Sequence, residues 1–218
     1  MALRLRLENL EPHVAADAGG SLDEALGEVD RMTGILNALL LLARAESGTR
    51  GPEPVDVLAV TEERVACWRL VAQPQQIALA IDSESAPVVL AVPGTLDQIL
   101  DVFLDNALRA APAGTTIHLR LVEDAGRVAV QCIDAGPGMS EAERARACDR
   151  FWRGANAASG EGSGLGLAIA ASLARANDGH VLLQEAPGGG LQAEARLPAW
   201  PASAPQPTNA AFLEHTWR

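Results

Sequence analysis

The chain has 218 residues, of which 48% are hydrophobic, enough to form the core of one large domain or two modest ones. Its formal net charge of −11 argues against a general nucleic-acid-binding protein, which would need a basic face. No apolar run approaches the roughly 20 residues that span a bilayer, no signal peptide is predicted, and the 3 scattered cysteines indicate reduced thiols of a cytoplasmic protein.

The first segment of the chain predicts a helical hairpin. Leucines within residues 3–10 alternate with Arg and Glu, which suits either the end of an amphipathic helix or a strand, and Gly19-Gly20 interrupts the pattern. A second helix is predicted from Ser21, which can form a capping box with Glu24, and its apolar stripe continues to Ala43. So long a stripe needs a partner, and we expect the hairpin to dimerise into a helical bundle.

Beyond a Gly- and Pro-rich linker at 48–54, the pattern changes to mixed helices and strands. Short apolar runs between turn residues predict strands, and apolar residues at three- and four-residue steps predict helices. In chain order we expect a helix over 57–71, strands over 77–81 and 88–92, a helix over 96–111, a hairpin of strands over 116–122 and 127–133, a helix over 141–153, a helix from residue 165, and strands over 180–185 and 191–197. The Pro- and Ala-rich tail after residue 198 is predicted to be disordered.

A glycine ladder, EGSGLGL at 161–167, stands directly before the Ala-rich helix. Glycines let backbone amides approach a ligand, and the positive end of a helix dipole favours an anion. Two common phosphate-binding motifs are excluded, because the P-loop needs Gly-Lys-Ser/Thr and the dinucleotide fingerprint needs a glycine where Leu167 stands. Taken alone, the ladder is equally compatible with a flexible loop packed against a helix.

Two further segments carry polar residues in unusual places. The helix over 96–111 contains FLDNALRAAP, in which Val102, Asn106 and Arg109 share one strip beside the apolar face. A mid-helix Asn is intrinsically unfavourable, so it indicates either a function or a solvated or capping side chain. Asp134 begins DAGPGM at the end of a predicted strand, where it could bind a ligand or form only an Asx turn. RFWRG at 150–154 precedes the ladder.

In this order, the segments resemble the ATP-binding domain of sensor histidine kinases, in the GHKL superfamily. LDNALRAAP is similar to the family's N box, DAGPG to its first glycine box, RFWRG to its F box and GSGLGLAIA to its second glycine box. EVDRMTGILNALLLLARAES at 28–47 resembles the second dimerisation helix. The resemblance covers nearly everything from Leu3 to Pro198.

The resemblance implies an α+β fold, a two-layer α/β sandwich of the GHKL or Bergerat type in which helices cover a mixed sheet, preceded by a helical hairpin. It divides the chain into a partial dimerisation hairpin and linker (1–51), an ATP-binding catalytic domain (52–198) and a Pro/Ala-rich tail (199–218).

The resemblance also assigns roles. Asp134 would accept a hydrogen bond from the adenine amino group, and Asn106 would give an oxygen to Mg²⁺ and act in catalysis together with Arg109. Residues 139–162 would form a lid over ATP, anchored by Phe151 and Arg153. The remaining nucleotide-binding residues would be Gly136, Gly138, Gly162, Gly164, Leu165 and Gly166.

The sequence departs from the family pattern at three places. Val102 stands one helical turn before Asn106, where the family has another Asn or a similar polar group, and Ala110 replaces an aromatic residue. No histidine lies in an H box, the segment with the phosphate-accepting His, so we expect the acceptor upstream of Met1 and no autophosphorylation of this chain. The histidines are His13, His118, His180 and His215.

We therefore interpret the chain as the catalytic part of a two-component sensor histidine kinase. It would form a homodimer through its hairpin, and it would transfer the ATP γ-phosphate to a His and onward to a response regulator. It would be cytoplasmic, would bind no nucleic acid, and would reach a membrane only through a missing upstream segment. An alternative is an ATP-binding regulatory scaffold without kinase activity. A gyrase-like or chaperone-like ATPase is less favoured, because Val102 cannot act as the acidic base that those enzymes need.

Overall fold

The computed structural model describes residues 51–154 and 164–201. The predicted hairpin, residues 155–162 of the predicted lid and all but the first residues of the tail lie outside this range. Within the described part, no helix is both long enough and apolar enough to cross a membrane.

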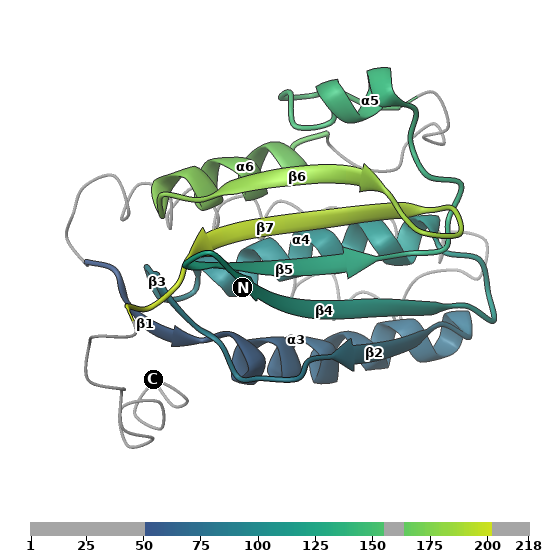
Figure 1. Ribbon diagram of the computed structural model, residues 1–218. Coiled ribbons are helices and arrows are strands. Elements are labelled where there is room, and N and C mark those ends of the chain that lie inside the picture. Colours follow the sequence, from purple (N-terminus) through teal and green to yellow (C-terminus); the bar gives the residue numbers. More distant parts are fainter. Residues whose placement is uncertain (1–50, 155–163, 202–218) are drawn as a thin grey trace, which may run out of the picture. The chain divides into compact units, whose positions relative to one another are not determined.

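The centre of the fold is a five-stranded mixed sheet (Figure 1). Strands β2 and β4, at one edge of the sheet, are parallel to each other, and every other neighbouring pair of strands is antiparallel. A parallel pair needs a crossover connection, and here the chain passes through β3 and α4 between β2 and β4. In spatial order the strands are β2 (Ala78–Asp82), β4 (Thr116–Asp124), β5 (Arg127–Ile133), β7 (Leu191–Pro198) and β6 (His180–Glu185).

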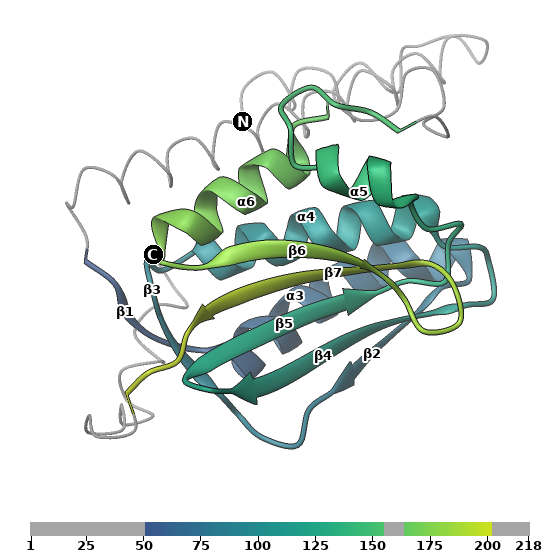
Figure 2. The same cartoon turned by 45° about the horizontal axis from the view of Figure 1, so that its top comes forward.

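Three helices cover one face of this sheet, which makes the predicted two-layer sandwich (Figures 1 and 2). They are α3 (Val57–Ala72), α4 (Thr95–Ala110) and α6 (Gly166–Ala176). The central helix α4 is amphipathic: its buried side chains recur at three- and four-residue steps, as the sequence predicts. They are Leu96, Ile99, Leu100, Phe103, Leu104, Ala107 and Leu108.

The segment before α3 differs from the predicted linker. Residues Glu53–Asp56 form strand β1, which pairs antiparallel with β3 (Val88–Ala91), with Val55 opposite Val89. Asp56 then caps α3, because its Oδ1 atom accepts a hydrogen bond of 3.0 Å from the Ala59 amide. The strand is only four residues long and adjoins Pro and Gly residues, so its composition indicated a linker.

The predicted helix over 141–153 is too long. Helix α5 spans Glu141–Arg146, begins with a capping box between Ser140 and Glu143, and ends at Ala147. Phe151 has a φ of 64°, in the left-handed region, which no α-helix contains. The charged composition of the segment suited a helix throughout, but only its first half forms one.

Candidate functional site

Asp134 follows β5 directly and is buried, with 6% of its surface exposed. Its Oδ1 atom accepts hydrogen bonds from the amides of Gly136, at 2.8 Å, and Leu191, at 3.2 Å. Burial raises the pKa of the carboxyl group, and these two hydrogen bonds oppose that rise. Within residues 51–154 and 164–201 no hydrogen bond reaches Oδ2, so this oxygen can accept one from a ligand.

The first glycine box, which continues from Asp134, lies between two parts of the fold. A β-carbon on Gly136 would stand 2.8 Å from the Ala110 carbonyl oxygen, at the end of α4. Gly138 has a φ of 69°, and its β-carbon would stand 2.8 Å from the carbonyl oxygen of Gly190 in the turn between β6 and β7. Any larger side chain would therefore push this loop away from α4 or from that turn.

Asn106 and Arg109 lie on α4, as predicted. Asn106 is half-buried, and among the described residues its side-chain amide forms no hydrogen bond. Its carbonyl oxygen is thus available to a cation or a polar ligand. Arg109 forms an ion pair with Asp105, in which Nε lies 3.0 Å from each carboxylate oxygen. Both side chains are nearly half exposed, so this pair costs little free energy to rearrange.

The start of α6 lies against the strip of α4 that carries Asn106. A β-carbon on Gly166, the first residue of α6, would stand 3.3 Å from Cγ1 of Val102. Leu165 precedes the helix, and its side chain does not cap the amides of the first turn. The N-terminal amides and the helix dipole provide a positive end that suits a phosphate group.

The F box and the second glycine box are joined by their backbones. The Phe151 amide donates a hydrogen bond of 2.9 Å to the carbonyl oxygen of Gly164. Gly164 has a φ of 64°, and a β-carbon there would stand 2.6 Å from the Trp152 carbonyl oxygen. Phe151 is 72% exposed and Arg153 is also exposed. The predicted phosphate-binding Gly162 lies outside the described residues.

The described residues contain no group of three or more His, Cys, Asp or Glu side chains that could hold a metal ion. A single amide oxygen such as that of Asn106 suits a cation that takes its other ligands from water and from phosphate groups. Mg²⁺ is bound in this way in many proteins, because it keeps several waters and few protein ligands. The available donor at Asn106 fits such an ion.

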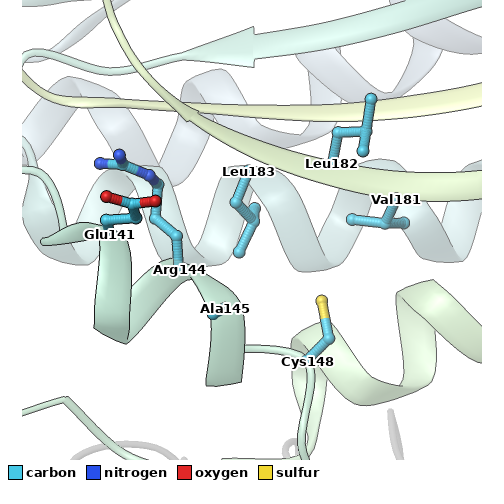
Figure 3. Close-up of a pocket in the computed structure, with 7 residues that line it drawn as sticks. All are labelled: Glu141, Arg144, Ala145, Cys148, Val181, Leu182 and Leu183. Atoms are coloured by element: carbon cyan, nitrogen blue, oxygen red, sulfur yellow. The ribbon is translucent and has the colours of Figure 1, made fainter.

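Two hollows flank α5, and neither is lined by Asp134 or Asn106. One, of about 410 Å³, lies between α5 and β6, and Figure 3 shows Leu183 and Cys148 pointing into it from opposite sides. The other, of about 480 Å³, is lined by residues 137–141 together with Arg144, Glu185, Gly189 and Gly190. The candidate site is therefore defined by its polar groups rather than by a closed pocket.

The sequence did not predict the part that the β6–β7 turn plays at this site. Leu191 both donates to the Asp134 side chain and accepts a hydrogen bond of 3.0 Å from the Asp134 amide. The glycines at 188–190 indicated only a turn, and nothing in their pattern indicated that Gly190 would lie against a residue more than fifty positions earlier.

Comparison with known proteins finds relatives of this chain in both sequence and fold. Residues 91–201 match the family model described as histidine kinase-, DNA gyrase B-, and HSP90-like ATPase. The chain is 28% identical over 216 residues to the sensor protein SphS of Synechococcus elongatus, covering 94% of this chain and 52% of SphS. It is 33% identical over 186 residues to the probable sensor histidine kinase TcrY of Mycobacterium tuberculosis, covering 82% of this chain and 37% of TcrY.

A solved structure shows the same fold. Full-length ShkA in complex with AMPPNP superposes with a TM-score of 0.69 at 27% sequence identity, covering 93% of this chain and 45% of ShkA. This chain thus spans about half, or less, of the length of each of these three proteins.

Proposed function

Because this chain belongs to the histidine kinase-, DNA gyrase B-, and HSP90-like ATPase family, we propose that it is the ATP-binding catalytic part of a two-component sensor histidine kinase. Its similarity to SphS and TcrY, a sensor protein and a probable sensor histidine kinase, supports the sensor-kinase branch of that family. The AMPPNP in the ShkA structure supports an adenine nucleotide as the ligand.

The observation that carries the proposal is the environment of Asp134. Its Oδ1 atom is held by two backbone amides, and the carboxylate is buried at a strand end beside the first glycine box. Such a carboxylate accepts a hydrogen bond from the amino group of adenine. Guanine has a carbonyl oxygen at that position, which would leave two acceptors facing each other without a proton.

The phosphates and their metal would lie toward α4 and α6. Asn106 offers an oxygen to Mg²⁺, and the first-turn amides of α6, beginning at Gly166, offer hydrogen bonds to phosphate oxygens. Arg109, on the same helix as Asn106, adds a positive charge. Bound Mg²⁺ would neutralise phosphate charge, and phosphoryl transfer needs little beyond such neutralisation and correct positioning.

The phosphate acceptor would be a histidine in an H box of the dimerisation hairpin, and a response regulator would receive the phosphate next. The two histidines that the structure describes do not fit that role, because His118 lies within β4 and His180 begins β6. Since no histidine of the sequence lies in an H box, we propose an acceptor His in another part of the protein, a homodimer through residues 1–47, and a cytoplasmic location with any membrane attachment through a segment outside this sequence.

Transfer in trans tests this function. The chain would be incubated with γ-labelled ATP, Mg²⁺ and a dimerisation hairpin that contains an intact H box, with a His→Gln hairpin as the control. We expect an acid-labile label on the intact hairpin alone, and none on the chain by itself. Label that appears on the control hairpin or on the chain itself would contradict the assignment.

A regulatory ATP-binding scaffold is the second candidate, and one observation favours it. Val102 occupies the strip beside Asn106 and packs toward Gly166, so it offers no oxygen to a metal or its waters. Tight Mg-ATP binding without transfer to any H-box hairpin would support the scaffold over the kinase.

A further inference from the structure

The turn between β6 and β7 contains three glycines with the same backbone conformation but different surroundings. Gly188, Gly189 and Gly190 each have a φ of 95°. A β-carbon on Gly188 or Gly189 would meet nothing within 4 Å, whereas one on Gly190 would stand 2.0 Å from the carbonyl oxygen of Asp134. Backbone conformation alone would favour glycine at all three positions, but only Gly190 is needed for close approach.

This close approach brings the turn into contact with both the main chain and the side chain of Asp134. The amide of Leu191, next to Gly190, donates a hydrogen bond of 3.2 Å to the Asp134 carboxylate. The Leu191 carbonyl oxygen accepts a hydrogen bond of 3.0 Å from the Asp134 amide. The carbonyl oxygen of Gly190 also lies 2.8 Å from where a β-carbon on Gly138 would stand. One turn therefore contacts the main chain of Asp134, its side chain and the first glycine box.

We propose that Gly190 is a positioning residue for adenine recognition, because its lack of a side chain lets the turn approach Asp134 closely enough for the Leu191 amide to orient the carboxylate. This inference rests on the proposed function, in which Asp134 binds the adenine amino group. With Oδ1 held by Leu191 and Gly136, Oδ2 is the oxygen left for the nucleotide.

A methyl group at position 190 must separate the turn from Asp134, since 2.0 Å is far below any carbon–oxygen contact distance. The 3.2 Å hydrogen bond from the Leu191 amide would lengthen or break, and the carboxylate would lose one of the two amides that hold it. A methyl group at position 188 adds the same backbone strain at the same φ without that collision. Gly188→Ala is therefore a matched control for Gly190→Ala.

The test compares ATP with purine riboside triphosphate, which lacks only the 6-amino group. Calorimetry on the whole chain would give the ratio of the two affinities for the unchanged protein, Gly188→Ala and Gly190→Ala. We expect Gly188→Ala to keep the preference for ATP and Gly190→Ala to reduce it about tenfold, the effect of losing a hydrogen bond with a charged partner. A general loss of folding would lower both affinities together and leave their ratio unchanged.

A second variant is available if Gly190→Ala does not fold. Replacing the Leu191 amide by an ester removes its N–H donor and adds no atoms, and we expect the same loss of preference. An unchanged ratio in a folded Gly190→Ala protein or in the ester variant overturns the inference. If the unchanged protein binds both nucleotides equally, the adenine contact of Asp134 in the proposed function fails, independently of Gly190.

Discussion

The Cγ1 atom of Val102 lies 3.3 Å from the point at which a β-carbon on Gly166 would stand. This contact joins the polar strip of α4 to the first residue of α6, two segments more than sixty residues apart in the sequence. It means that Val102 has a packing role beside the proposed phosphate site, and that a side chain at position 166 would crowd Val102.

The contact predicts energetic coupling between the two positions. Gly166→Ala should be more destabilising with Val102 present than in a Val102→Ala background, because the smaller side chain removes the collision. We expect a coupling free energy of about 1 kcal/mol, within the range for residues in contact. Urea denaturation of the two single variants and the double variant measures it, and additive effects would show that the helices do not meet here.

The same position predicts an effect on metal-dependent binding. Val102→Asn places an amide oxygen one turn before Asn106, on the same side of α4. We expect it to tighten Mg-ATP binding more than metal-free ADP binding, by about 1 kcal/mol, the net worth of one added hydrogen bond. Calorimetry with and without Mg²⁺ provides both values, and Val102→Ala controls for the loss of bulk. Equal changes for the two ligands would mean that Val102 serves packing alone.

Arg109 is predicted to contribute to nucleotide binding despite its ion pair with Asp105. An exposed pair of this kind contributes roughly 0.5 kcal/mol or less, so a phosphate group can replace the carboxylate as its partner. Arg109→Ala should weaken ATP binding several-fold, whereas Asp105→Ala should leave the affinity for ATP the same or higher. Titration of both variants with Mg-ATP checks this, and matching losses in the two would assign the pair a purely structural role.

The raised pKa of Asp134 predicts how stability depends on pH. A carboxyl group whose pKa is higher in the folded state than in the unfolded chain favours folding when protonated, and this contribution is lost as the pH rises through the folded-state pKa. Asp134→Asn keeps a side-chain oxygen for the two amides and removes the buried charge. Without nucleotide, the variant should therefore gain stability relative to the unchanged protein as the pH increases from 4 to 7.

Urea denaturation across that range measures the difference between the two proteins. Burial also raises the pKa of Asp97 and Asp101 on α4. Their contributions to the pH dependence are present in both proteins and cancel in the difference between the two unfolding free energies. A difference that stays constant with pH, or that falls as the pH rises, would contradict the raised pKa of Asp134.

Much of the fold was predictable because its elements carry strong local patterns. The apolar periodicity of α4 and the short apolar runs of β4 and β5 predicted these elements within about two residues. The predicted hairpin of these two strands is joined by a turn at Gly126, which has a φ of 76° next to Ala125 at 48°. Local signals of this kind require no knowledge of what lies nearby in space.

The failures occurred where tertiary contacts decide the structure. Strand β1 pairs with β3 along its whole length, and nothing within its four residues predicts that partner. The chain is no longer helical after Arg146, and the Phe151 amide bonds to the Gly164 carbonyl oxygen. The local sequence pattern does not show that these two segments meet. The position of Gly190 against Asp134 has the same origin, since hydrophobic patterns do not show which turn lies against which strand end.

The response of thermal stability to nucleotides tests the proposed adenine site most directly. At about 100 times its Kd, a bound nucleotide stabilises the folded state by roughly 2.7 kcal/mol. A thermal-shift series would compare ATP, ADP and GTP on the unchanged protein, on Asp134→Ala, and on Asp124→Ala, which removes an exposed carboxylate at the far end of β4. We expect ATP and ADP to raise the melting temperature of the unchanged protein and of Asp124→Ala, GTP to have little effect, and Asp134→Ala not to respond. An unaltered response to ATP in Asp134→Ala would contradict the assignment of the adenine site.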